Sequence, residues 1–70
     1  MSKFIKDSIK EMEIDLTNEM ENRTETNYNG LAIATCERRL ESAKDAQYLL
    51  EIGEISLIEA EDMVSEAFMI

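Results

Sequence analysis

Histidine, proline and tryptophan are absent from this 70-residue chain, and cysteine occurs only once, at Cys36. Without histidine and with a single thiol, the chain cannot supply the four Cys and His ligands of a structural zinc site. One cysteine also excludes an intrachain disulfide. The sequence therefore predicts no metal, no cofactor and no covalent cross-link.

The parts from which catalytic sites are built are also missing. Histidine is the commonest general base, and no serine, threonine or cysteine stands in a recognisable nucleophile pattern. The sequence contains no Gly-rich phosphate loop and no calcium-loop spacing. Carboxylates are plentiful, but paired acid and base roles need a cleft that separates their pKa values. We expect no enzymatic activity.

Positive charge is scarce. Seven Lys and Arg residues stand against 16 Asp and Glu residues, which gives a net charge of −9. This balance keeps a protein soluble and makes a phosphate backbone a repulsive partner, so we expect no direct binding of nucleic acid. Residues 1–16 alternate charged and apolar side chains and never form the apolar run of a signal peptide or a membrane span. We therefore expect a cytoplasmic protein with no membrane contact.

The length of the chain limits its stability. Residues 1–70 are enough for a single domain, which buries only about 60% of the surface that its unfolded form exposes. Disulfides and metals are not available to add stability. We therefore expect the protein to form a homo-oligomer or to dock on a protein partner.

Glycine is rare, at Gly30 and Gly53 only, and apolar residues recur every three or four positions. Because proline is absent too, this pattern predicts an all-α fold with three helices, at about 2–22, 29–52 and 56–69. Each of the first two helices carries one apolar stripe. The stripes are formed by Ile5, Ile9, Met12, Leu16 and Met20, and by Ile33, Cys36, Leu40, Ala43, Gln47 and Leu50. On this stripe Cys36 is predicted to be a small buried side chain.

The connection between the second and third helices has a clear local pattern. Gly53 suits the left-handed position just after a helix, where a side chain would be penalised. Ser56 and Glu59 form a Ser-x-x-Glu capping box, which starts a helix. Because this connection is so short, the second and third helices are predicted to form an antiparallel αα-hairpin.

Two acidic rows are the first candidate binding surface. Asp7, Glu11, Asp15 and Glu19 recur every fourth residue, which places carboxylates about 6 Å apart along one helix face. On the third helix the acidic residues are Glu59, Asp62 and Glu66. The rows could imitate nucleic acid and block a DNA- or RNA-binding protein, as an anti-restriction or anti-CRISPR inhibitor would. Alternatively, they are simply solvated faces of soluble helices.

A second candidate surface gathers cationic and aromatic residues, namely Tyr28, Arg38, Arg39 and Tyr48. Arginine can bind phosphate with two hydrogen bonds and tyrosine can stack on a base. In an oligomer these residues could hold a nucleotide-like anion. The simpler interpretation is that the arginines pair with neighbouring carboxylates and the tyrosines cover the core.

A third candidate surface is apolar and rich in methionine, which adapts to partner surfaces but also fills irregular cores. It comprises Met12, Met20, Met63, Phe68 and Ile70. The leading hypothesis is a small acidic helical regulator or inhibitor that binds a protein partner through helix faces. A bias toward Ile, Lys, Asn and Glu in a short acidic chain is common among small phage and mobile-element proteins.

Overall fold

The computed structural model describes residues 2–24 and 29–70 and contains three α-helices. They are α1 (Lys3–Glu21), α2 (Gly30–Glu51) and α3 (Leu57–Ala67), and the described residues include no strand. The predicted all-helical fold is therefore confirmed. Each helix begins one residue later than predicted because the residue assigned as first is its N-cap. These caps are Ser2, Asn29 and Ser56.

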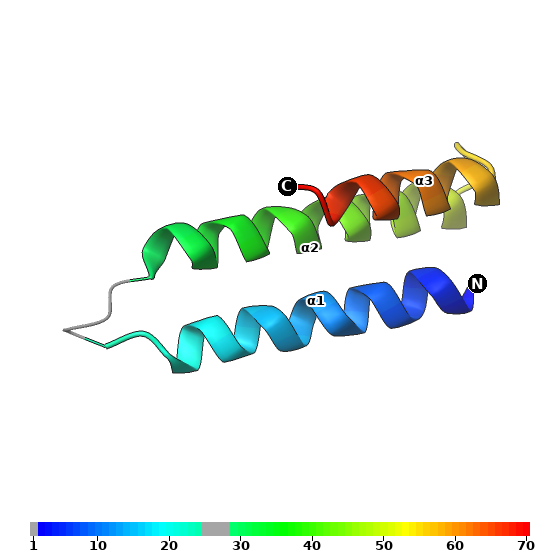
Figure 1. Ribbon diagram of the computed structural model, residues 1–70. Coiled ribbons are helices and arrows are strands. Elements are labelled where there is room, and N and C mark those ends of the chain that lie inside the picture. Colours follow the sequence, from blue (N-terminus) through cyan, green and yellow to red (C-terminus); the bar gives the residue numbers. More distant parts are fainter. Residues whose placement is uncertain (1, 25–28) are drawn as a thin grey trace.

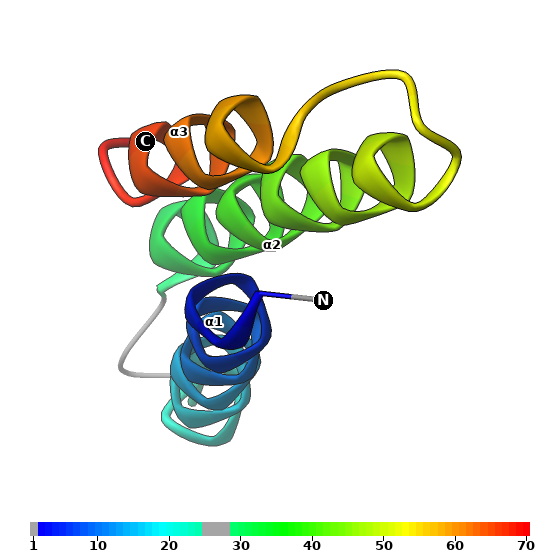
Figure 2. The same ribbon diagram turned by 90° about the vertical axis from the view of Figure 1, so that its right-hand side faces the viewer.

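The three helices form an elongated bundle with extents of 45 × 17 × 17 Å. α1 and α2 run side by side in opposite directions, and α3 returns along the second half of α2 (Figure 1). Viewed along the long axis, α2 lies between α1 and α3 (Figure 2). Since α3 has half as many residues as α2, the bundle has three helices in one half and two in the other.

The turn before α3 has the geometry that its sequence predicts. Gly53 adopts φ +78°, and its amide donates to the carbonyl oxygen of Leu50 at 3.1 Å. The next amide, of Glu54, donates to Leu49 at 2.9 Å, which completes a Schellman motif. The capping box is present as well. The Glu59 amide donates to Ser56 Oγ at 3.2 Å, and the Ser56 amide donates to Glu59 Oε1 at 3.3 Å.

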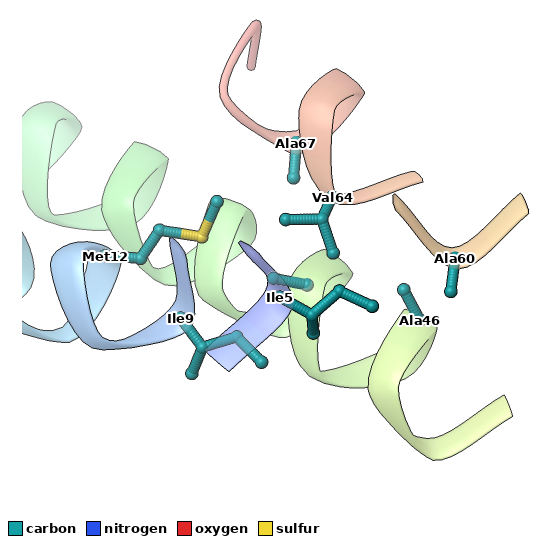
Figure 3. Packing of buried hydrophobic residues seen from close by; sticks show 8 residues of the cluster. Ile5, Ile9, Met12, Ala46, Ala60, Val64 and Ala67 are labelled. Atoms are coloured by element: carbon teal, nitrogen blue, oxygen red, sulfur yellow. The ribbon is translucent and has the colours of Figure 1, made fainter. Parts of the chain in front are cut away.

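The hydrophobic core lies in the three-helix half of the bundle (Figure 3). α2 and α3 contribute mainly alanines, which allow their backbones to approach closely, whereas α1 contributes the larger side chains. Leu40, Leu50, Ile55, Met63 and Phe68 pack around this centre. The core residues are Ile5, Ile9 and Met12 from α1, Ala43 and Ala46 from α2, and Ala60, Val64 and Ala67 from α3.

The burial of Met12 corrects one expectation. This side chain is only 2% exposed and belongs to the core, so it offers no surface to a partner. Met20 continues the same stripe two turns later and is largely exposed. The difference arises because Met12 lies in the half that α3 covers, whereas Met20 lies in the two-helix half.

Candidate functional site

Two apolar residues, one at each end of α3, are exposed. Ile58 is 74% exposed and Met69 is 87% exposed. Ile58 lies in the first turn of α3 and Met69 lies in the turn just after its last residue, Ala67, so the length of the helix, about 17 Å, separates them. Asp62 lies between them, with Glu66 beside it, and both carboxylates are exposed. We call these four residues the outer face of α3.

The other acidic residues of α3 have partners within the chain. Glu59 closes the capping box through its side chain. Glu61 accepts a hydrogen bond of 2.6 Å from Ser2 Oγ, which ties the beginning of α1 to α3. Of the three predicted acidic residues of α3, Asp62 and Glu66 are therefore the two that take no part in the cap.

The acidic row of α1 is shorter than expected. Asp7, Glu11 and Asp15 are exposed, but Glu19 is half-buried and engaged. The side-chain amide of Asn29 donates to Glu19 Oε2 at 2.8 Å and to its main-chain oxygen at 2.7 Å. Asn29 thereby links the end of α1 to the beginning of α2 and does not cap α2 with its own side chain. Three carboxylates of the row remain on the exposed face.

A groove follows α2 in the two-helix half, beyond the end of α3. Its floor includes the half-buried Ala32 and the buried Cys36, and Leu31 stands at its edge with 81% of its surface exposed. Thr35 donates its hydroxyl to the Leu31 main-chain oxygen at 3.0 Å. Glu19, Asn29 and Arg39 complete the lining. We call this surface the open-half groove.

One buried polar atom beside the open-half groove receives no hydrogen bond from the described residues. Among the described residues, Asn29 Oδ1 is the buried side-chain atom left without a hydrogen-bond partner. The amide nitrogen of the same side chain is fully used by Glu19. The groove thus combines an apolar floor, one acidic residue, one basic residue and one unsatisfied acceptor.

Of the cationic and aromatic candidates, the structure describes Arg38, Arg39 and Tyr48. Arg39 donates from Nε and Nη2 to the main-chain oxygen of Ile70, at 3.0 and 2.7 Å. Arg38 and Tyr48 are both exposed, and helical geometry places them about 15 Å apart along α2. Tyr28 lies outside the described residues. Arg39 therefore holds the end of α3 in place.

The remaining apolar candidates differ in exposure. Met63 and Phe68 are half-buried against the core, whereas Met20 and Ile70 are exposed. Cys36 is a buried free thiol, which confirms its predicted role as a small core-like side chain. Within the described part of the chain, no group of three or more Cys, Asp or Glu side chains is arranged to hold a metal ion.

Two exposed residues, Leu31 and Ile58, were missed by the sequence reasoning. Leu31 precedes Ile33 by two residues, which places it about 200° from the stripe of α2. Ile58 follows Leu57 and lies about 120° from the buried Val64. The sequence shows both residues outside the apolar stripe of their helix. An apolar residue in such a position indicates an exposed binding surface or a second packing surface.

Comparison of the chain with protein-family models, with curated proteins and with solved structures gave no match. None of the helices formed by residues 2–24 and 29–70 is long and apolar enough to cross a membrane.

Proposed function

We propose that this protein is a non-catalytic regulator or inhibitor that acts by binding another protein through the outer face of α3. The observation that carries the proposal is the exposure of Ile58 and Met69 on either side of Asp62 and Glu66. Two apolar anchors with acidic residues between them fit a partner of matching chemistry. Such a partner presents a cationic side chain between two apolar pockets or side chains about 17 Å apart.

The expected energetics separate affinity from specificity. Full burial of Ile58 and of Met69 contributes about 1.5–3 kcal/mol for each side chain. The rim carboxylates contribute less to affinity, since exposed ion pairs are typically worth about 0–1 kcal/mol. Their role is to accelerate association with a cationic partner and to reject acidic ones. We therefore expect the apolar anchors to supply most of the affinity and the carboxylates to determine which partner binds.

In this proposal, the packing of α3 on α2 holds the outer face of α3 in a fixed position. We treat α2 and α3 as an antiparallel αα-hairpin, connected at Gly53 and fixed by the capping box, that presents the outer face of α3 on a rigid support. The same proposal includes a cytoplasmic location and homo-oligomerisation. The contact between copies does not use the outer face of α3, which remains available for the partner.

The experiment compares three versions of the protein as bait in an extract of its native host. Wild-type protein and Leu31→Asp should recover the same partner at stoichiometric levels, and Ile58→Asp should not. Leu31→Asp is the matched control because Leu31 is as exposed as Ile58 but lies on another surface. Recovery of the partner by Ile58→Asp at the wild-type level would refute the assignment of this face.

An acidic mimic of nucleic acid is the second candidate function. It is favoured by the exposure of Asp7, Glu11 and Asp15 at a spacing of about 6 Å along α1. In that case the partner would be a DNA- or RNA-binding protein with a basic groove. Binding should then weaken steeply with salt, and the double variant Glu11→Gln and Asp15→Asn should abolish it. Unchanged binding by that variant would exclude the mimic and leave the outer face of α3 as the contact.

A further inference from the structure

The open-half groove is a surface that the proposed partner contact does not use. We propose that a second copy of this chain covers it, with the two copies related by a twofold axis. In this dimer the two-helix half of one copy packs against the two-helix half of the other. The two α3 helices then lie at the outer ends of the assembly, with their outer faces free.

The lengths of the helices account for the groove. α2 has 22 residues and α3 has 11, which correspond to about 33 Å and about 17 Å. About 16 Å of α2 therefore extends past α3 with no third helix beside it. Because a second copy has an uncovered segment of the same length, two copies placed head to head can close both gaps at once.

The charges in the groove favour a second copy over a strongly charged partner. The lining contains one acidic residue, Glu19, and one basic residue, Arg39. Under a twofold axis the Arg39 side chain, while it keeps its hydrogen bonds to Ile70, can approach the Glu19 side chain of the other copy. The opposite charges of the groove then face each other across the axis. A cationic partner would find a better match on the outer face of α3.

The size of the groove sets the expected strength of the dimer. A strip about 16 Å long and about 20 Å wide, the width of two helices, covers roughly 300 Å² on each copy. The pair would bury roughly 600 Å², below the range of stable interfaces and within that of weak, transient ones. We therefore expect a weak dimer that dissociates on dilution. Leu31 is its main apolar contact because it is the most exposed side chain of the lining.

The test measures mass in solution by sedimentation equilibrium over a range of concentrations. Wild-type protein should pass from monomer to dimer, and Leu31→Asp should raise the dissociation constant by at least about tenfold, since it places an unpaired charge in the contact. Ile58→Asp is the matched control and should leave the dimer unchanged. Circular dichroism checks that both variants are folded, which is expected because both positions are exposed.

The dependence of dimerisation on salt concentration is a second test, because salt should affect the dimer and the partner contact in opposite directions. Two copies of net charge −9 repel each other, and raising the salt from 0.1 M to 1 M shortens the screening length from about 10 Å to about 3 Å. Dimerisation should therefore strengthen with salt, whereas binding of a cationic partner should weaken. A monomer at every concentration, a larger oligomer, or a dimer that Leu31→Asp leaves intact would overturn the proposal. Equal loss of the dimer in both variants would overturn it too.

Failure of this proposal is distinguishable from failure of the proposed function. The dimer depends on Leu31 and the partner contact depends on Ile58, and each variant is the control for the other. If the protein is monomeric and still recovers its partner through Ile58, only the dimer is lost. If it dimerises through Leu31 and recovers no partner, only the partner contact is lost.

Discussion

Replacing Ile5 with alanine should remove a large part of the stability of this protein. The Ile5 side chain is 0% exposed and lies among Ala46 and Val64 in the core (Figure 3). Truncation of a buried isoleucine to alanine costs about 2–5 kcal/mol, and more when the surroundings cannot move into the cavity. Several neighbours are alanines, whose side chains have no rotamers with which to fill the space. We therefore expect about 3–5 kcal/mol, out of a total of about 4–10 kcal/mol for a chain of this length.

The matched control for this prediction is Ile14→Ala in the same helix. Ile14 lies nine residues after Ile5, which turns it about 180° away, and it is 52% exposed. Its replacement should change the free energy of unfolding by no more than about 0.5 kcal/mol. Alanine's higher helix propensity should offset part of the lost contact.

The assay is urea unfolding followed by circular dichroism, because the chain contains no tryptophan. With a urea dependence of about 1 kcal/mol per M, Ile5→Ala should lower the midpoint by about 3–5 M and Ile14→Ala by less than about 0.5 M. All samples need the same protein concentration, since a dimer links stability to concentration. Equal shifts for the two variants would refute the assignment of the core to this face of α1.

Three further predictions concern the ends of the helices. Gly53→Ala should cost about 1–2 kcal/mol in unfolding free energy because φ is +78°, with no steric clash since nothing lies within 4 Å of the added carbon. Ser56→Ala should cost about 1 kcal/mol by removing the hydroxyl that accepts from the Glu59 amide; a cost near zero would show that the cap is dispensable. Arg39→Ala should release Ile70 and accelerate hydrogen exchange in the last turn of α3, whereas unchanged exchange would mean that the two hydrogen bonds do not hold this end.

The features that could be predicted from the sequence are those set by neighbouring residues. The left-handed Gly53 and the capping box of Ser56 and Glu59 depend only on local backbone chemistry, and both are present as predicted. The period of three to four located all three helices. Their starts were placed one residue early because an N-cap residue shares the sequence pattern of the first turn without its backbone conformation.

The features that could not be predicted depend on how far one helix covers another. Met12 and Met20 occupy the same stripe, yet only Met12 is buried, because α3 ends before it reaches the level of Met20. Glu19 has the same spacing as the exposed acidic residues of α1, but its carboxylate accepts a hydrogen bond from the Asn29 side-chain amide and is half-buried. These outcomes arise from contacts between segments, which a helical period does not specify.

The most direct test of the account is the affinity of the isolated partner, measured by calorimetric titration with wild-type protein, Ile58→Asp and Leu31→Asp. Loss of the Ile58 anchor corresponds to about 1.5–3 kcal/mol, so Ile58→Asp should bind about 10- to 100-fold more weakly. Leu31→Asp should bind within about twofold of wild type, since its surface serves the dimer. Equal affinity of Ile58→Asp and wild type would contradict the claim that the protein acts through the outer face of α3.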